Sequence, residues 1–189
     1  MYVARILYPV EVLGPGKRVG IWLCGCPRRC RGCSNPELWE QLPRYKTTAG
    51  DVFEMVRSIA AENPIDGFTI SGGDPMMQAE ELSELISLLR NISEDILVYT
   101  GYELSELDPR YLRGIAVLID GEYIEERNSN CFLRGSDNQK IHVLDARYAD
   151  IYDNYCKNGK NRIQNFFMRD GIVSVGIHRP GFFAPIDKN

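Results

Sequence analysis

The sequence predicts an α/β fold whose mostly parallel sheet forms part of a (β/α) barrel, with a β-hairpin near the C-terminus. Between residues 19 and 119, short apolar runs alternate with segments of helical character, beginning and ending with a strand. This alternation is typical of parallel strands joined by right-handed crossovers, and four such strands make about half of an eight-stranded barrel. Close to the end, residues 166–168 and 172–177 flank the turn sequence Arg169-Asp170-Gly171, which predicts the hairpin.

The first strand of the series is predicted at residues 19–23, after the turn-prone sequence Gly14-Pro15-Gly16. Residues 2–8 are a candidate to pair beside it. A helix is expected to follow Thr48, with Thr48 as its N-cap and Asp51 as the capping partner. The apolar residues of this helix recur at helical spacing: Val52, Met55, Val56, Ile59 and Ala60.

The remaining elements continue the alternation. Residues 67–71 predict a buried strand, and a second helix is expected to begin near Glu80 and Glu81 and to end near Asn91. Its apolar face is made by Leu82, Leu85, Ile86 and Leu89. The later segments are a strand at 96–100, a broken helical connection at 103–112 around Pro109, and a strand at 115–119.

Composition argues against several classes of partner. The chain has 189 residues, a net charge of −4 and a pI near 5.3, which disfavours nucleic acid or an anionic membrane as the main partner. No apolar run approaches the roughly 20 residues of a membrane span, and no leader follows Met1, so the expected location is the cytoplasm. Without repeats or a linker, residues 1–189 are expected to form one domain with an irregular C-terminal third.

Four of the six cysteines crowd into residues 24–33, directly after the first predicted strand. In a parallel α/β sheet, ligand sites lie beyond the carboxyl ends of the strands. The spacing of Cys26, Cys30 and Cys33 allows three thiolates to converge on a four-iron cluster, which leaves the fourth iron open for a small molecule. The alternative is a zinc site that also uses Cys24. We interpret Cys24, at the end of a strand, as a small buried residue.

A second candidate loop follows the strand predicted at 67–71. Gly72 and Gly73 would let the backbone approach a ligand closely, and Asp74 would place a carboxylate near an ammonium group. The alternative is an ordinary loop whose acidic residue starts the next helix. The two later strands also run into turn sequences, Thr100-Gly101-Tyr102 and Asp120-Gly121, at the same edge of the sheet.

These residues resemble the radical S-adenosylmethionine (SAM) superfamily, and within it the activating proteins of anaerobic (class III) ribonucleotide reductase. Two positions differ from the usual pattern of that family, which more often has glutamate at the place of Asp74 and histidine at the place of Ser34. The resemblance covers most of the chain and is carried by Gly25-Cys26-Pro27, Cys30, Gly32-Cys33, Asn35-Pro36-Glu37, Ser71-Gly72-Gly73-Asp74-Pro75, Tyr99-Thr100-Gly101, Asp120-Gly121, Gly135-Ser136, Asn138-Gln139, Val175-Gly176-Ile177 and Pro180-Gly181-Phe182.

The resemblance implies a [4Fe-4S] cluster held by Cys26, Cys30 and Cys33, with SAM chelating the fourth iron. It implies one radical SAM domain over residues 1–189, with a cluster loop at 24–35 and a SAM-binding loop at 71–75. An electron from a flavodoxin-like or ferredoxin-like donor would cleave SAM to a 5′-deoxyadenosyl radical, which in this family generates a glycyl radical on the large reductase subunit. The residues implied to bind SAM are Gly32, Cys33, Ser34, Gly72, Gly73 and Asp74.

Two other functions stay open at this stage. The same core could activate another glycyl radical enzyme or modify a peptide. A non-catalytic zinc or iron–sulfur binding module would use only the cysteines, and the loop at Asp74 would then be incidental. Replacement of Asp74 would weaken SAM binding in the enzymes and would change nothing in the module.

Three arginines lie inside the cysteine loop. Arg28, Arg29 and Arg31 could stabilise a reduced cluster or meet an acidic partner, or they could form a solvated basic loop. Trp22 and Trp39 flank the loop and are expected to pack under it.

The other polar residues have weaker assignments. Asp120 is interpreted as part of a turn, with contact to SAM or substrate as the alternative. Residues 134–140 are placed near the opening where a partner would bind. Four residues are interpreted as plain thiols or structural side chains: Cys131, Cys156, His142 and His178.

Overall fold

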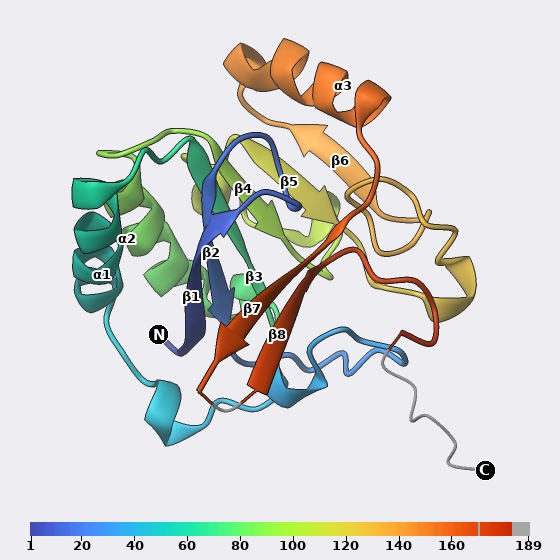
Figure 1. Ribbon diagram of the computed structural model, residues 1–189, viewed down its shortest axis with the longest axis horizontal. Coiled ribbons are helices and arrows are strands. Elements are labelled where there is room, and N and C mark those ends of the chain that lie inside the picture. The colour runs from blue at the N-terminus through green and yellow to red at the C-terminus, as the bar shows by residue number, and fades with distance from the viewer. Residues whose placement is uncertain (170, 183–189) are drawn as a thin grey trace.

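The computed structural model describes residues 1–169 and 171–182 and is built on one open sheet (Figure 1). In spatial order its strands are β1 (Val3–Val10), β2 (Arg18–Leu23), β3 (Gly67–Gly72), β4 (Ile96–Tyr99), β5 (Val117–Asp120) and β6 (Lys140–Val143). Strands β2 to β5 are parallel, whereas the edge strands β1 and β6 each pair antiparallel with their neighbour. The predicted α/β class with a mostly parallel sheet is confirmed, and the sheet does not close on itself.

The antiparallel edges follow from how the chain connects. Strand β1 pairs with β2 so that Ile6 lies opposite Ile21, which confirms the candidate pairing of residues 2–8. Residues 11–17 join the two strands, and so short a connection suits an antiparallel pair because a parallel crossover needs a dozen or more residues. Strand β6 was not predicted. It is short and lies at the edge of the sheet, where its side chains are partly exposed.

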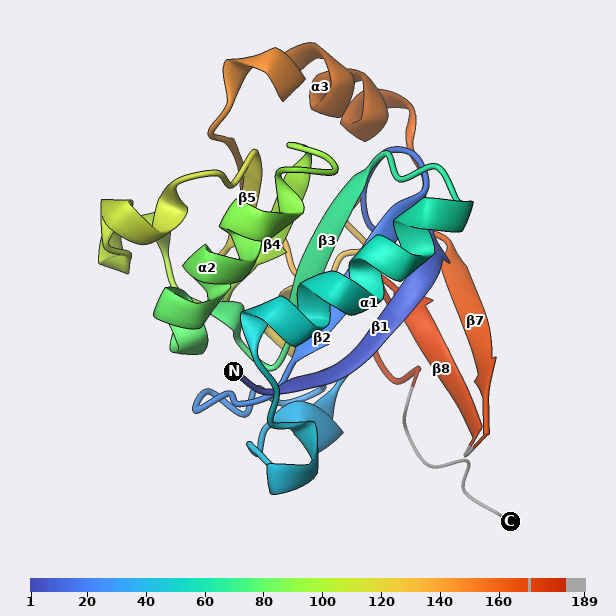
Figure 2. The ribbon, with the colours of Figure 1, turned by 90° about the vertical axis from the view of Figure 1, so that its left-hand side faces the viewer.

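Two helices cover the same face of the sheet, as Figure 2 shows. Helix α1 (Ala49–Glu62) begins with the predicted capping box, in which Asp51 N donates to Thr48 Oγ1 over 3.1 Å and Thr48 N donates back to the Asp51 carboxylate. Helix α2 (Ala79–Leu89) ends slightly before the expected Asn91. Both predicted helices are therefore confirmed, and their apolar faces pack on alternate residues of the strands.

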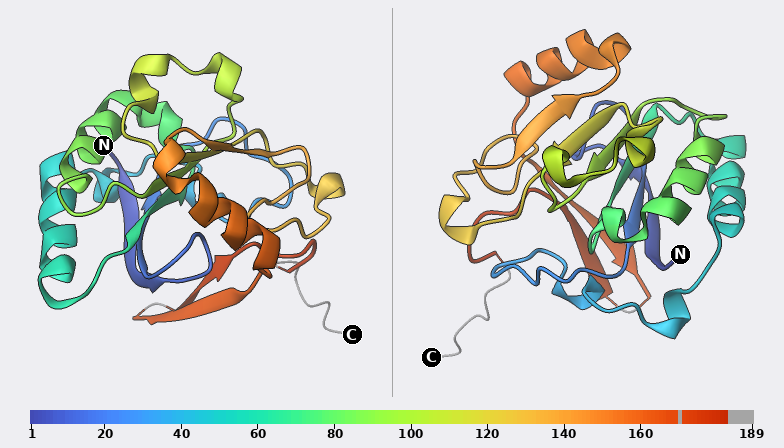
Figure 3. Two further views of the ribbon diagram at one scale, coloured as in Figure 1. Left: turned by 90° about the horizontal axis from the view of Figure 1, so that it is seen from above. Right: turned by 180° about the vertical axis from the view of Figure 1, so that it is seen from behind.

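The opposite face of the sheet is partly covered by the C-terminal hairpin. Trp22 of β2 and Cys24 just after it belong to a second apolar cluster, away from the side that α1 and α2 cover. Strands β7 (Ile163–Met168) and β8 (Gly171–Gly176) pair antiparallel and pack Val175 into this cluster. Figure 3 shows the hairpin on the far side of β1 and β2 from α1. The predicted hairpin is confirmed, although Asp170 of its turn lies outside the described residues.

The C-terminal third is not irregular, so that expectation was wrong. Besides β6 it contains helix α3 (Ala149–Asn158), whose Tyr152 packs on Leu97 and Val117 in a third apolar cluster. The connection at 103–112 is broken as expected, into the short 3₁₀ helices Leu104–Glu106 and Pro109–Leu112. Within the described ranges, every helix is too short or too polar to cross a membrane.

A buried ion pair fastens the amino ends of the parallel strands. Arg18, the first residue of β2, is fully buried, and its Nη1 lies 2.7 Å from Oδ2 of Asp95, just before β4. The same guanidinium donates to Thr69 Oγ1 (2.8 Å), and Tyr152 of α3 donates its hydroxyl to Asp95 Oδ1 (2.7 Å). Strands β2, β3 and β4 and helix α3 are thus joined at the end of the sheet opposite to the cysteine loop.

Candidate functional site

The cysteine loop after β2 is tied to its surroundings by backbone hydrogen bonds. Gly25 N donates to Leu38 O (2.8 Å), and Cys26 N donates to Trp39 O (3.0 Å). From the loop after β3, Asp74 N donates to Gly25 O (2.7 Å). The start of the cysteine loop is therefore held on one side by residues 38–39, which follow the loop, and on the other by the loop after β3.

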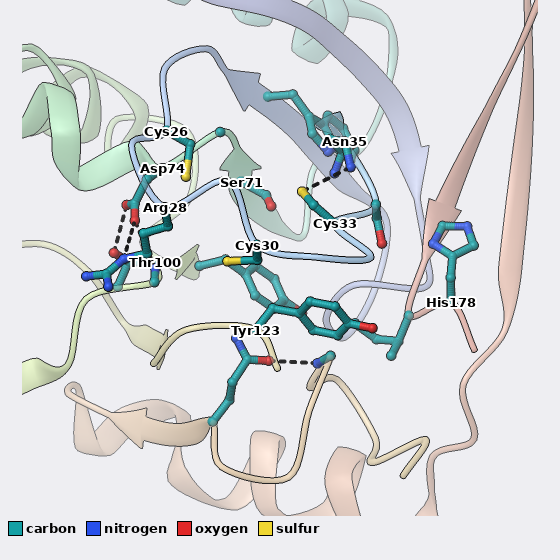
Figure 4. Close-up of a pocket in the computed structure, with 18 of the residues that line it drawn as sticks. Cys26, Arg28, Cys30, Cys33, Asn35, Ser71, Asp74, Thr100, Tyr123 and His178 are labelled. Carbon is teal, nitrogen blue, oxygen red and sulfur yellow. Dashed lines mark hydrogen bonds and ion pairs between the residues drawn. The ribbon is translucent and has the colours of Figure 1, made fainter. Parts of the chain in front are cut away.

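Cys26, Cys30 and Cys33 line one cavity at this edge of the sheet (Figure 4). Burial, followed by the carboxylate of Glu122 and then the charges of Cys26 and Cys33, raises the pKa of Cys30 to about 11. The Glu122 carboxylate lies 3.6 Å from the Cys30 sulfur. The charges of both other thiols thus act on Cys30 across the cavity that the three cysteines share.

Cys33 has two N–H groups beside its sulfur. Asn35 N donates to Cys33 Sγ over 3.4 Å, and the indole of Trp39 lies against the same sulfur atom. Burial raises the pKa of Cys33, while the contacts with Asn35 and Trp39 lower it. The surroundings of Cys33 therefore offset part of the cost of a buried negative charge.

This set of thiols fits an iron–sulfur cluster better than a single metal ion. Among residues 1–169 and 171–182, no three His, Cys, Asp or Glu side chains are placed to hold one metal ion. Cys24 is fully buried in the apolar cluster under the hairpin and lies outside the cavity wall, as its interpretation as a buried residue requires. A structural zinc site needs four close ligands, whereas a four-iron cluster can take three separate thiolates.

Asp74 connects three loops at the carboxyl ends of the strands. Its side chain is 1% exposed and accepts hydrogen bonds from Thr100 Oγ1 (2.8 Å), Gly101 N (2.9 Å) and Met76 N (3.1 Å). Arg28 Nε, from the cysteine loop, lies 4.0 Å from Asp74 Oδ2. Burial raises the pKa of Asp74, and these hydrogen bonds and Arg28 lower it, so that burial dominates.

Four of the six residues implied to bind SAM line the cavity together: Cys33, Ser34, Gly73 and Asp74. Gly72 lies behind this wall, with a φ of 122° and no room for a side chain against the backbone of Leu23. Gly32 borders a neighbouring cavity on the outer side of the cysteine loop. The structure thus brings most of the predicted site together and leaves two glycines at its margin.

The sheet and the cysteine loop match a known family. Residues 12–142 match the model described as a 4Fe-4S single cluster domain. Relatives from several organisms carry the name anaerobic ribonucleoside-triphosphate reductase-activating protein. The relative from Vibrio cholerae is 36% identical, over 71% of this chain and 94% of its own length. The relative from enterobacteria phage T4 is 34% identical, over 71% of this chain and 90% of its own length. The relative from Escherichia coli K12 is 30% identical, over 72% of this chain and 96% of its own length. The chain belongs to this family of activating proteins.

The match to the 4Fe-4S single cluster domain ends at residue 142, before α3 and the hairpin. The likeness of residues 175–177 and 180–182 to the tail of the family therefore stays a prediction. In this member of the family, residues 174–178 form one wall of the cavity that the three cysteines line. Ser174 Oγ lies 3.0 Å from His178 Nε2, and Asn128 Nδ2 donates to His178 O (2.9 Å), which holds the wall in place.

Sequence reasoning missed several cavity residues, among them Tyr123, Ser174 and His178. His178 was interpreted only as structural, and no spacing in the sequence indicated that it lies beside the cysteines. The segment 134–140 had been placed near the opening, and its Gln139 does line the cavity. Gln139 braces this segment, because its Oε1 accepts from Gly135 N (2.8 Å) and its Nε2 donates to Gly121 O (2.8 Å).

Asp120 binds the backbone at Leu104 and does not line the cavity. Its Oδ2 accepts from Leu104 N (2.7 Å) and lies 2.9 Å from His142 Nε2. Asp120 is the last residue of β5, directly before the bend at Gly121, and its carboxylate gives His142 a structural partner. Cys131 and Cys156 lie away from the three cavity cysteines, and Cys156 packs in the third apolar cluster.

The loop arginines are paired within the chain. Arg29 pairs with Glu40, and Arg31 Nε lies 3.0 Å from Glu125. Arg28 differs, because it stacks on the ring of Tyr102 at 4.4 Å and faces the cavity. The basic character expected for this loop is therefore largely neutralised by glutamates of the same chain. Trp22 and Trp39 both line the cavity.

Proposed function

We propose that this activating-protein family member is a radical SAM enzyme that generates a glycyl radical on the large subunit of anaerobic ribonucleotide reductase. The observation that carries the proposal is the cavity wall shared by three thiols and the loop of Gly73 and Asp74. Cys26, Cys30 and Cys33 would hold a [4Fe-4S] cluster. When bound, the cluster and SAM supply reductive cleavage of the sulfonium bond, with the electron from a flavodoxin-like or ferredoxin-like donor.

The residues of this chain would position SAM and keep water away from it. Gly73 has no side chain, so SAM could approach the backbone after β3, and the charge of Asp74 would favour the ammonium group. Ser34 and Gly32 would border SAM from the cysteine loop, and Gly72 would allow the turn. Apolar and aromatic side chains complete the wall and limit the access of water: Trp22, Trp39, Tyr99, Val175 and Ile177.

The proposal extends to the fold and location. The open sheet of β2 to β5 would correspond to part of a (β/α) barrel, in a single radical SAM domain over residues 1–189. The side left open would admit a loop of the reductase. All six cysteines are free, which suits a reducing compartment such as the cytoplasm.

The proposed chemistry is tested by the formation of 5′-deoxyadenosine. The protein is reconstituted anaerobically with iron and sulfide, mixed with SAM and dithionite, and compared with Cys30→Ala. We expect the product from the unaltered chain and at least a hundredfold less from Cys30→Ala, because one cluster ligand is lost. Cys131→Ser, outside the cavity, should keep full activity. A colourless, inactive protein loaded with zinc would contradict the proposal.

SAM placement is tested separately by Asp74→Asn. The substitution keeps the size of the side chain and removes its charge, so we expect the dissociation constant of SAM to rise about tenfold, or about 1.4 kcal/mol. Equilibrium dialysis with the reconstituted, unreduced protein measures this, and iron content and melting temperature are checked in parallel. The matched control is Asp137→Asn, whose carboxylate pairs with Arg127 on the surface. Equal SAM affinity in Asp74→Asn and the control would remove Asp74 from the binding site.

A further inference from the structure

Trp39 touches both ends of the cysteine loop. Its backbone oxygen accepts the hydrogen bond from Cys26 N (3.0 Å), at the first of the three cavity cysteines. Its side chain lies against the sulfur of Cys33, the last of them. The residue directly follows the short 3₁₀ helix Pro36–Leu38, which fixes its direction, since Trp39 N donates to Pro36 O. Trp39 is therefore held in place by backbone contacts before any cofactor binds.

The indole N–H of Trp39 is buried and incompletely paired. Within the described part of the chain, no acceptor meets its N–H at the distance and angle of a good hydrogen bond. A buried donor without an acceptor costs about 1–3 kcal/mol, and native proteins retain such a group mainly where it has a function or a bound partner. The group that lies beside this N–H is the sulfur of Cys33.

Cys33 differs from the other two cavity cysteines in the groups around its sulfur. It already accepts a hydrogen bond from Asn35 N at 3.4 Å. The side-chain neighbour of Cys30 is the carboxylate of Glu122, which cannot donate when ionised. Among the hydrogen bonds of the described residues, none brings an N–H to the sulfur of Cys26 or Cys30. Donors therefore gather at one of the three proposed ligands.

A thiolate that ligates iron carries more negative charge than a neutral thiol and is a stronger acceptor. Hydrogen bonds to ligand sulfurs stabilise the additional negative charge of a reduced cluster and so raise its reduction potential. A hydrogen bond from the Trp39 indole to the Cys33 sulfur would give the buried N–H an acceptor and would make reduction of the cluster easier. The fold holds the donor in position beside a sulfur that becomes the better acceptor when it binds iron.

We propose that Trp39 is a positioning residue whose indole N–H donates a hydrogen bond to the Cys33 sulfur in the cluster-bound protein and makes the cluster easier to reduce. This inference rests on the proposed function. It assigns to Trp39 a specific electronic effect in addition to packing.

The test is the midpoint potential of the reconstituted cluster, measured by a redox titration followed by electron paramagnetic resonance without SAM. In Trp39→Phe the aromatic ring is kept and the N–H is lost. We expect reduction to be disfavoured at least tenfold, which for one electron is a potential about 59 mV more negative. The control is Tyr111→Phe, which removes a surface hydroxyl that contacts Glu80 and lies outside the cavity. Its potential should equal that of the unaltered chain.

A second variant removes the effect of ring size. Incorporation of 3-benzothienylalanine at position 39 keeps the bicyclic shape and replaces the N–H by sulfur. The same negative shift supports the proposal even if Trp39→Phe assembles its cluster poorly. An unchanged potential in the benzothienyl variant overturns it. If 5′-deoxyadenosine still forms in that case, only this inference fails. If the unaltered chain assembles no four-iron cluster, the proposed function fails first.

Discussion

Replacing Arg18 with methionine is expected to lower the free energy of unfolding by about 3–5 kcal/mol, because it leaves the buried carboxylate of Asp95 without its counter-ion. Methionine fills much of the volume of the arginine stem, so loss of charge and of hydrogen bonds dominates over cavity formation. Arg18 Nη1 lies 2.7 Å from Asp95, and both Phe68 O and Asp95 O accept from the same guanidinium. Urea unfolding followed by circular dichroism measures the change.

The matched control for Arg18 is an exposed arginine in an ion pair. Arg110 lies 2.7 Å from Asp108, and its side chain is 74% exposed. Since water screens an exposed pair and the pair contributes little to stability, Arg110→Met should leave the free energy of unfolding nearly unchanged. If Arg18→Met lowers the free energy of unfolding no more than Arg110→Met does, the buried network contributes little to stability. Helix α3 is then held mainly by apolar contacts.

Replacing Gly73 with alanine is expected to reduce iron incorporation at least tenfold while the helices and sheet remain folded. A Cβ at this position would lie 2.4 Å from Gly25 O and 2.8 Å from Leu38 O. Both atoms belong to the backbone that carries the cysteine loop, and Gly25 O is also the acceptor of Asp74 N. The loop would have to move away from the sheet, at a cost of about 1–3 kcal/mol for overpacking. Iron and sulfide analysis after reconstitution gives the readout.

Gly50→Ala provides the comparison for Gly73→Ala. Gly50 lies in the first turn of α1, and an added Cβ would meet only Thr48 Oγ1 at 3.8 Å. Alanine favours a helix over glycine by about 0.5–1 kcal/mol, so this variant should be slightly more stable and should bind iron normally. Normal iron content in Gly73→Ala would show that the cysteine loop tolerates displacement from the β3 end.

Local patterns predicted the parts of the fold whose determinants lie close together in sequence. The capping pair Thr48 and Asp51 marked the start of α1, and the spacing of Leu82, Leu85 and Leu89 marked α2, because these signals depend on contacts within one or two turns. The cysteine spacing indicated the proposed ligands for the same reason. The strand ends that carry Gly73 and Gly101 could be placed at one edge because parallel topology aligns them.

The features that were missed depend on contacts distant in sequence. Strand β6 is only four residues long and helix α3 is mostly polar, and α3 is tied to the sheet by the hydrogen bond from Tyr152 to Asp95 in another part of the chain. The position of His178 in the cavity wall depends on the hairpin packing against β1 and β2, which no local pattern encodes. The same applies to the hydrogen bonds of Asp74, two of which come from Thr100 and Gly101 in the loop after β4.

The wall contributed by β8 also affects when the site can form during synthesis. A chain made from its N-terminus exposes Cys26, Cys30 and Cys33 well before residues 174–178 have been added. Contacts between segments so far apart form late, because closing a long loop costs entropy that later contacts must offset. Until β7 and β8 pack against the sheet, the three thiols of a nascent chain are therefore more accessible to other metal ions and to oxidants.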